Sequence, residues 1–160
     1  MATTDHPTTD APAAVPELRN AGTAPATRRK LFLNLPVADL QRTIRFFEAL
    51  GFTFDPHFTD AKATCMLVGD DAYCMLLTRP FFETFSGRPV GDPVAQPYLS
   101  LALALDARAD VDAMVERAIA HGGEAAGEAM DHGFMYQRGF RDLDGYHWDP
   151  FWMDPAAIPG

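Results

Sequence analysis

The sequence predicts an α+β protein made of two tandem βαβββ modules, whose two four-stranded curved sheets surround a shared cavity. An aliphatic ladder at every second residue occurs at Leu31–Val37 and again at Leu99–Leu105, which is the period of a strand with one core face. Each ladder is followed by an amphipathic helical pattern and three further strand patterns, so the chain contains an internal repeat. Asp144 and Gly145 form a typical hairpin turn between the last two strands.

Module one is expected at about residues 31–80. Asp39 is placed to cap a helix that continues to Leu50, because apolar residues recur at three- and four-residue spacing, and Gly51 ends it. Three strands are then expected, at residues 52–58, 64–68 and 73–78.

Module two is expected at about residues 97–154. Its helix has an apolar face that includes Val111 and Val115, and it ends at Gly122. The strands that complete it are expected at residues 124–130, 134–141 and 146–152.

The segment Pro80–Phe85 between the modules is unusually aromatic. Three interpretations remain open for it. It is a short helix that closes over the cavity, a contact for a second subunit, or a part of the core, and the last is favoured.

Outside residues 29–154 we expect tails. Residues 1–28 consist mainly of Thr, Ala, Pro and Asp and hold too little apolar surface to offset the entropy of ordering, so a disordered tail is predicted. Residues 155–160 are predicted as a C-terminal tail. The N-terminus has no basic start followed by an apolar stretch, which argues against a secretory signal.

Composition narrows the class of partner. The chain has 22 acidic and 13 basic residues and a formal net charge of −9, which argues against nucleic acid or an anionic membrane surface as partner. No run of 18 apolar residues is present, so no membrane span is expected. Cys65 and Cys74 show no disulfide framework and are expected to be reduced thiols in a cytoplasmic protein, although one hairpin register would place them opposite each other.

The strand pattern also predicts which side chains face the cavity. The aliphatic residues of both ladders, together with Trp148 and Trp152, should face the helices, so the alternate residues should point to the opposite face. The residues expected on that face are Phe32, Asn34, Cys74, Leu76, Thr78, Ser100, Ala102, His147, Asp149 and Phe151.

Three segments resemble the vicinal-oxygen-chelate superfamily, which contains glyoxalases, bleomycin-resistance proteins and dioxygenases. Leu35–Leu40 and Phe46–Phe52 are similar to its opening strand and helix, and Asp142–Asp149 is similar to its closing hairpin and last strand. The resemblance covers residues 31–154 and implies the glyoxalase/bleomycin-resistance/dioxygenase fold.

The resemblance also implies where a metal would bind. Metal-dependent members carry one ligand at the start of each module and one in its last strand, and by position these fall on Phe32, Leu76, Ser100 and Asp149. Only Asp149 suits a divalent metal, and a single carboxylate does not hold a catalytic ion. The implied metal site is therefore degenerate, with His132 and His147 as alternative partners of Asp149.

Two functions remain open. The first is a resistance- or sequestration-type protein that binds a small aromatic or amphipathic molecule in an apolar cavity without a resident cofactor. The alternative is a lyase, isomerase or dioxygenase that acts on a small oxygen-rich substrate, with non-standard metal ligands or with Asp149 or His147 as a metal-free base. A homodimer and a pseudo-dimeric monomer are both compatible with the pattern. The predicted ligand contacts are Phe32, Asn34, Leu76, Ser100, His132, Tyr136 and Phe151.

Overall fold

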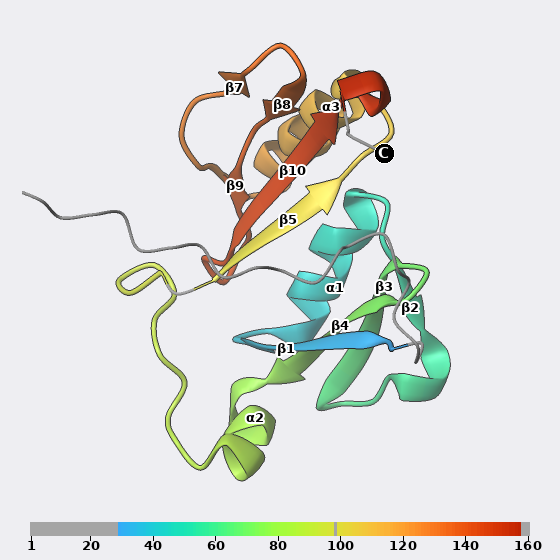
Figure 1. Cartoon of the computed structure of the whole chain (residues 1–160). Coiled ribbons are helices and arrows are strands. Elements are labelled where there is room, and N and C mark those ends of the chain that lie inside the picture. Colours follow the sequence, from blue (N-terminus) through green and yellow to red (C-terminus); the bar gives the residue numbers. More distant parts are fainter. Residues whose placement is uncertain (1–28, 98, 158–160) are drawn as a thin grey trace, which may run out of the picture.

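The computed structural model describes residues 29–97 and 99–157, and it contains two curved sheets, each with one helix packed on the side that faces the core (Figure 1). The predicted α+β fold with two modules is confirmed. The tail predicted for residues 1–28 and the last three residues of the C-terminal tail lie outside the described residues, and Pro155–Ala157 forms a single turn of 3-10 helix (η2).

Module one forms a sheet with the strand order β1-β4-β3-β2, in which β1 and β4 are parallel. Asp39 caps α1 as predicted, since its carboxylate accepts a hydrogen bond from the Arg42 backbone N–H at 2.9 Å. Gly51 follows the helix with a φ of 96°, a conformation that favours glycine. The elements are β1 (Leu31–Val37), α1 (Leu40–Ala49), β2 (Thr53–Asp55), η1 (Pro56–Phe58), β3 (Ala63–Gly69) and β4 (Ala72–Thr78).

Module two repeats the order, but two of its predicted strands are broken. The strand expected at 124–130 is interrupted near Gly127, which has a φ of 86°, and the strand expected at 134–141 is interrupted at Arg138 and Gly139. The elements are β5 (Ser100–Ala104), α3 (Arg108–Ala120), β6 (Glu124–Ala125), β7 (Met130–Asp131), β8 (Met135–Gln137), β9 (Phe140–Arg141) and β10 (His147–Met153). β10 pairs with β5, β8 and β9.

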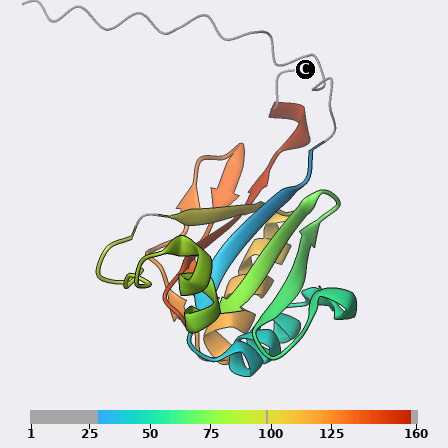
Figure 2. The same ribbon diagram turned by 90° about the horizontal axis from the view of Figure 1, so that it is seen from below.

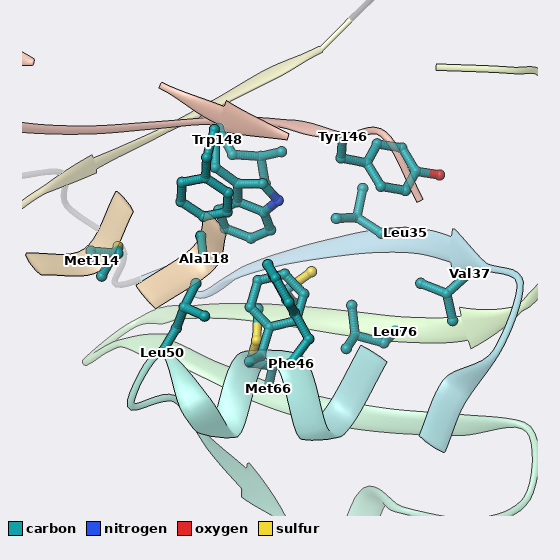
Figure 3. Close-up of a cluster of buried hydrophobic side chains, with 14 of the residues drawn as sticks. Leu35, Val37, Phe46, Leu50, Met66, Leu76, Met114, Ala118, Tyr146 and Trp148 are labelled. Atoms are coloured by element: carbon teal, nitrogen blue, oxygen red, sulfur yellow. The ribbon is translucent and has the colours of Figure 1, made fainter. Parts of the chain in front are cut away.

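A single core joins the helix-facing sides of both sheets (Figure 3). The ring of Phe47 on α1 lies 5.1 Å from that of Trp148 on β10, and Leu35 and Leu76 contribute to the same cluster from module one. Since the helix-facing sides meet here, the opposite sides, which we call the outer faces, do not enclose a common cavity within one chain. Phe32 on the outer face of module one is 51% exposed.

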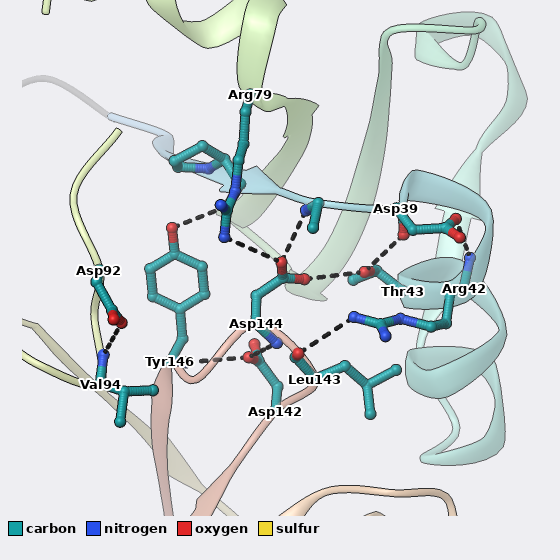
Figure 4. Close-up of polar contacts among 12 residues, drawn as sticks. Asp39, Arg42, Thr43, Arg79, Asp92, Val94, Asp142, Leu143, Asp144 and Tyr146 are labelled. Carbon is teal, nitrogen blue, oxygen red and sulfur yellow. Dashed lines mark hydrogen bonds and ion pairs between the residues drawn. The ribbon is translucent and has the colours of Figure 1, made fainter. Parts of the chain in front are cut away.

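The closing hairpin of module two holds the two modules together (Figure 4). Asp144 accepts hydrogen bonds from the Ala38 backbone N–H at 2.7 Å and from the Thr43 hydroxyl at 3.2 Å, at the start of α1. The buried Tyr146 hydroxyl donates to the Pro36 carbonyl at 2.9 Å. The Asp-Leu-Asp-Gly motif therefore has a structural role here, which is to fix how module two lies on module one.

The aromatic segment between the modules is α2 (Arg79–Ser86), so it is helical, but the favoured assignment to the core is wrong. It has no buried residue, Phe85 is 56% exposed, and α2 lies outside the sheets against β1 and β4 (Figure 2). Its aromatic side chains contact one another, as in the edge-to-face pair Phe81 and Phe85 with centroids 5.8 Å apart.

Both cysteines are free and buried. Cys65 lies opposite Met75 and Cys74 lies opposite Met66, so the two thiols are not cross-strand partners. Burial raises the pKa of the Cys74 thiol to about 12, which makes it an inert core residue. Among the residues that the structure describes, no helix is long and apolar enough to cross a bilayer.

Candidate functional site

The register of β4 corrects the predicted outer face of module one. In the parallel β1–β4 pair, Phe32 lies beside Tyr73 and Asn34 beside Met75, so these residues share the outer face. Leu76 is 1% exposed and belongs to the core. The prediction that Leu76 points to the ligand is therefore wrong, as it is for Cys74 and Thr78 on the same side of β4. The strand is apolar on both faces, so its pattern did not fix the phase.

The outer face of module one carries an aromatic pair beside a lysine. Phe32 and Tyr73 stack with their centroids 4.7 Å apart and their planes at 14°. The Lys30 ammonium lies 5.4 Å from the centroid of the Tyr73 ring and donates to its hydroxyl at 3.4 Å. Phe32 is thus exposed on the outer face and stacks on Tyr73, and its predicted contact with a ligand stays a prediction.

The outer face of module two brings together three of the predicted site residues. The parallel β5–β10 register places Ser100 beside His147 and Ala102 beside Asp149. The Ser100 hydroxyl donates to Asp149 Oδ2, and Asp149 Oδ1 lies 3.0 Å from His147 Nε2. We call Ser100, His147 and Asp149 the acid cluster.

Gly139 makes room for the acid cluster. A Cβ atom at this position would lie 2.7 Å from His147 Nε2 and 3.0 Å from Asp149 Oδ1. Any side chain here would therefore have to displace the imidazole, and it would crowd the Asp149 carboxylate and the Ala126 carbonyl oxygen, which also lies 3.0 Å away. Sequence reasoning missed this residue, and the available signal was a glycine inside a predicted strand, which often marks a close approach of another group.

Tyr136 lies on the opposite face of the sheet from the acid cluster. It pairs with Trp152, and its hydroxyl donates to Asp112 of α3 at 2.8 Å. Burial, followed by this hydrogen bond, raises the pKa of Tyr136. Asp112 also accepts from Arg138 at 2.8 Å. The predicted ligand contact of Tyr136 is therefore wrong, because the ring and its hydroxyl attach β8 to α3.

His132 does not join the acid cluster. It is exposed in the turn between β7 and β8, and its ring lies 6.3 Å from that of Phe134. Among the described residues, which include His132, His147 and Asp149, no group of three or more His, Cys, Asp or Glu side chains could hold a metal ion. The proposed alternative ligand set of these three residues is not formed.

A groove of about 270 Å³ lies between the modules. β1 is the edge strand of the first sheet and β5 pairs with β10 alone, so each strand has a free edge among the described residues. The groove is apolar except for Tyr73 and Ser100. Its lining residues are Leu31, Leu33, Val68, Ala72, Tyr73, Leu99, Ser100, Leu101, Ala102, Leu103 and Trp148.

Ser100 connects the groove to the acid cluster, because it lines the groove and also bonds Asp149. The other predicted contacts are distributed differently. Asn34 lines a second cavity of about 230 Å³ together with Phe82 of α2 and Arg88. Phe151 lies two residues beyond Asp149 on β10, and therefore on the same face, beside Ala104.

The family model of the Glyoxalase/Bleomycin resistance protein/Dioxygenase superfamily matches residues 31–149. A search of curated proteins finds no significant match.

Solved structures share the fold at low sequence identity. A hypothetical protein, SA1046, from S. aureus is 23% identical with a TM-score of 0.67, over 79% of this chain and 95% of that chain. A glyoxalase-related enzyme from Fulvimarina pelagi is 20% identical with a TM-score of 0.67, over 79% and 88%. A glyoxalase/bleomycin resistance protein/dioxygenase family enzyme from Burkholderia phytofirmans PsJN is 16% identical with a TM-score of 0.65, over 76% and 96%.

Proposed function

Because the chain belongs to the Glyoxalase/Bleomycin resistance protein/Dioxygenase superfamily, we propose that it binds and sequesters a small aromatic or amphipathic molecule in an apolar cavity. The observation that supports this is the groove between the modules, which is lined by leucines and Trp148 together with two hydroxyl-bearing residues, Tyr73 and Ser100. Apolar walls with a few polar groups are typical of small-molecule sites.

The size of the groove sets the size of the ligand. A volume of about 270 Å³ lies just below the usual range for drug-sized ligands, which begins at about 300 Å³. We therefore expect a compact molecule of one or two rings.

The residues at the family's metal positions do not fit a divalent ion. In the β1–β4 pair, Met75 lies beside Asn34, just as Asp149 lies beside Ala102 in the β5–β10 pair. The module-one residue that corresponds to Asp149 is therefore Met75 and not Leu76. Phe32 cannot ligate, and a thioether and a neutral hydroxyl are poor ligands for hard divalent ions. Asp149 is then the one suitable ligand of the four, which supports a degenerate metal site and a function without metal chemistry.

A homodimer belongs to the same proposal. Phe32, which stacks on Tyr73, is half exposed on the outer face of module one, and large exposed aromatic side chains are typical of protein interfaces. A second copy would cover this face, so that the outer faces of two chains enclose the space that one chain leaves open.

The acid cluster supports one alternative function. His147 and Asp149 lie 3.0 Å apart beside the groove, and a paired imidazole and carboxylate can transfer a proton to or from a bound substrate. Under this alternative the chain is a metal-free lyase or isomerase with Asp149 or His147 as the base. Conversion of a bound carbonyl compound, lost in Asp149→Asn and His147→Gln, would favour it over sequestration.

The neutral two-ring fluorescent probe 2-naphthol tests the sequestration function. We expect saturable binding with one site per chain, and we expect Leu33→Trp, which fills the groove, to weaken it at least about tenfold. Phe85→Trp adds an indole on the exposed face of α2 and should leave binding unchanged. Absence of saturable binding, or equal affinity in Leu33→Trp and the original chain, contradicts the proposal.

A further inference from the structure

The polar chemistry beside the groove is acidic. Ser100 lines the groove and donates its hydroxyl hydrogen to Asp149. The Asp149 side chain is 20% exposed, so the carboxylate is partly removed from water but still accessible. A carboxylate has about four lone-pair sites, and the contacts to Ser100 and His147 leave some of them free to accept a further hydrogen bond.

No lysine or arginine of the described residues neutralises Asp149, whose one ion-pair partner is His147. Arg141 lies beside His147 in the β9–β10 pair, but among the described residues no ion pair joins it to Asp149. Arg138 is engaged by Asp112 at 2.8 Å and by Glu116 at 2.9 Å on the α3 side. The described lining of the groove contains no basic side chain. The exposed Lys30 contacts this lining through Tyr73, to whose hydroxyl it donates.

A partly buried carboxylate without a lysine or arginine partner favours a cation and disfavours an anion. Its interaction with a ligand charge is stronger than in bulk water because the apolar groove lowers the local dielectric. The net charge of −9 over the whole chain acts in the same direction at longer range, since it attracts cations and repels anions.

We infer that the ligand of the groove carries a protonated amine on an apolar ring system, and that Asp149 selects it. This inference rests on the proposed function and adds the charge class of the ligand. The rings occupy the leucine-lined groove, and the ammonium group donates hydrogen bonds to Asp149 and accepts none. Ser100 acts as a positioning residue through its hydrogen bond to the carboxylate, His147 lies 3.0 Å from the carboxylate as its ion-pair partner, and Gly139 leaves the space in which the pair lies.

Three matched probes test the inference: 2-naphthylmethylamine, 2-naphthylmethanol and 2-naphthoate, which share one ring system and differ in charge. Binding is measured by titration calorimetry at pH 8, which is above the usual pKa of histidine. The salt concentration is kept low so that surface charges are only weakly screened. We expect the amine to bind about tenfold more tightly than the alcohol, and the naphthoate to bind most weakly.

Variants assign the preference to Asp149. Asp149→Asn should reduce the affinity for the amine to that for the alcohol and leave the affinity for the alcohol unchanged. Glu48→Gln removes the same charge from the exposed face of α1 and should keep the preference. Gly139→Ala should reduce the preference by displacing the acid cluster, whereas Gly91→Ala, where a Cβ meets no atom within 4 Å, should not.

Two failures are distinguishable. If the alcohol binds but the amine binds no more tightly, or if Asp149→Asn keeps the preference, the charge selection is wrong and the groove remains a binding site. If none of the three probes binds, the proposed function itself is wrong. A circular dichroism spectrum and melting temperature equal to those of the original chain confirm that Asp149→Asn is folded.

Discussion

At the scale of single residues, two aspartates of the closing hairpin, Asp142 and Asp144, lie in different surroundings. Asp142 is buried and accepts hydrogen bonds from the indole N–H of Trp148 and the backbone N–H of Tyr146. Burial nevertheless dominates and raises the pKa of Asp142 to about 6. The Asp144 carboxylate instead accepts a hydrogen bond from the Ala38 backbone N–H, just before α1, and lies 3.9 Å from the Arg79 guanidinium.

The raised pKa of Asp142 predicts a pH dependence of stability. The folded chain binds this proton more tightly than the unfolded chain, so its stabilising contribution is complete below about pH 4 and is lost as the pH rises through about 6. We expect the free energy of unfolding of the original chain, relative to Asp142→Asn, to fall by on the order of 3 kcal/mol between pH 4 and pH 7. Urea denaturation of both proteins across this range measures the difference, and parallel profiles contradict it.

At the scale of elements, the repeated modules start their helices differently. The Asp39 carboxylate caps α1, whereas Ala107 occupies the equivalent position before α3 and offers no side-chain cap. α1 also receives the closing hairpin at its first turn, while α3 is attached to its sheet through Asp112 and Arg138. The repeat therefore preserves the order of elements but not the contacts that hold them.

The difference in capping predicts opposite effects of substitution. Asp39→Ala should lower the free energy of unfolding by about 1 kcal/mol, because the Arg42 N–H loses its acceptor. Ala107→Ser should raise it by about 0.5–1 kcal/mol by supplying an acceptor that α3 lacks. Thermal or urea denaturation checks both, and a loss of stability in Ala107→Ser would show that the first turn of α3 is already satisfied.

At the scale of the whole molecule, the closing hairpin sets the relative position of the two sheets and hence the width of the groove. Its side chains reach the end of β1 and the start of α1, and the Arg42 guanidinium donates to the Leu143 carbonyl at 3.2 Å. Val94 of the inter-module segment lies over Gly145, where a Cβ would approach it to 2.3 Å. This contact therefore determines which residues of module one lie across the groove from Ser100 of the acid cluster.

Removal of the central carboxylate of this contact should uncouple the modules. Asp144→Ala leaves the Ala38 N–H without its acceptor and removes one of the two acceptors of the Thr43 hydroxyl, and we expect a loss of about 2–3 kcal/mol of stability. Asp70→Ala changes the exposed turn of module one and should cost less than about 0.5 kcal/mol. Chemical denaturation compares the two, and equal effects would contradict the role assigned to the closing hairpin.

Local patterns in the sequence were sufficient for the fold and for part of the candidate site. Alternation and helical spacing are set by each residue and its near neighbours, so β1, α1, β5, α3 and β10 could be predicted. The phase of β10 was also readable, because Trp148 alternates with the polar His147 and Asp149. The sequence therefore predicted that Ser100, His147 and Asp149 lie on the same face of module two.

Only the tertiary structure decided the features that depend on contacts distant in sequence. β4 is apolar on both faces, so its pairing with β1 was needed to place Leu76 in the core and Met75 outside it. The packing of the two sheets through their helix-facing sides replaced the enclosed cavity by a groove along two strand edges. The sequence by itself determined which elements form, because that choice is local; the groove beside the acid cluster depends on how the modules pack, which no local pattern encodes.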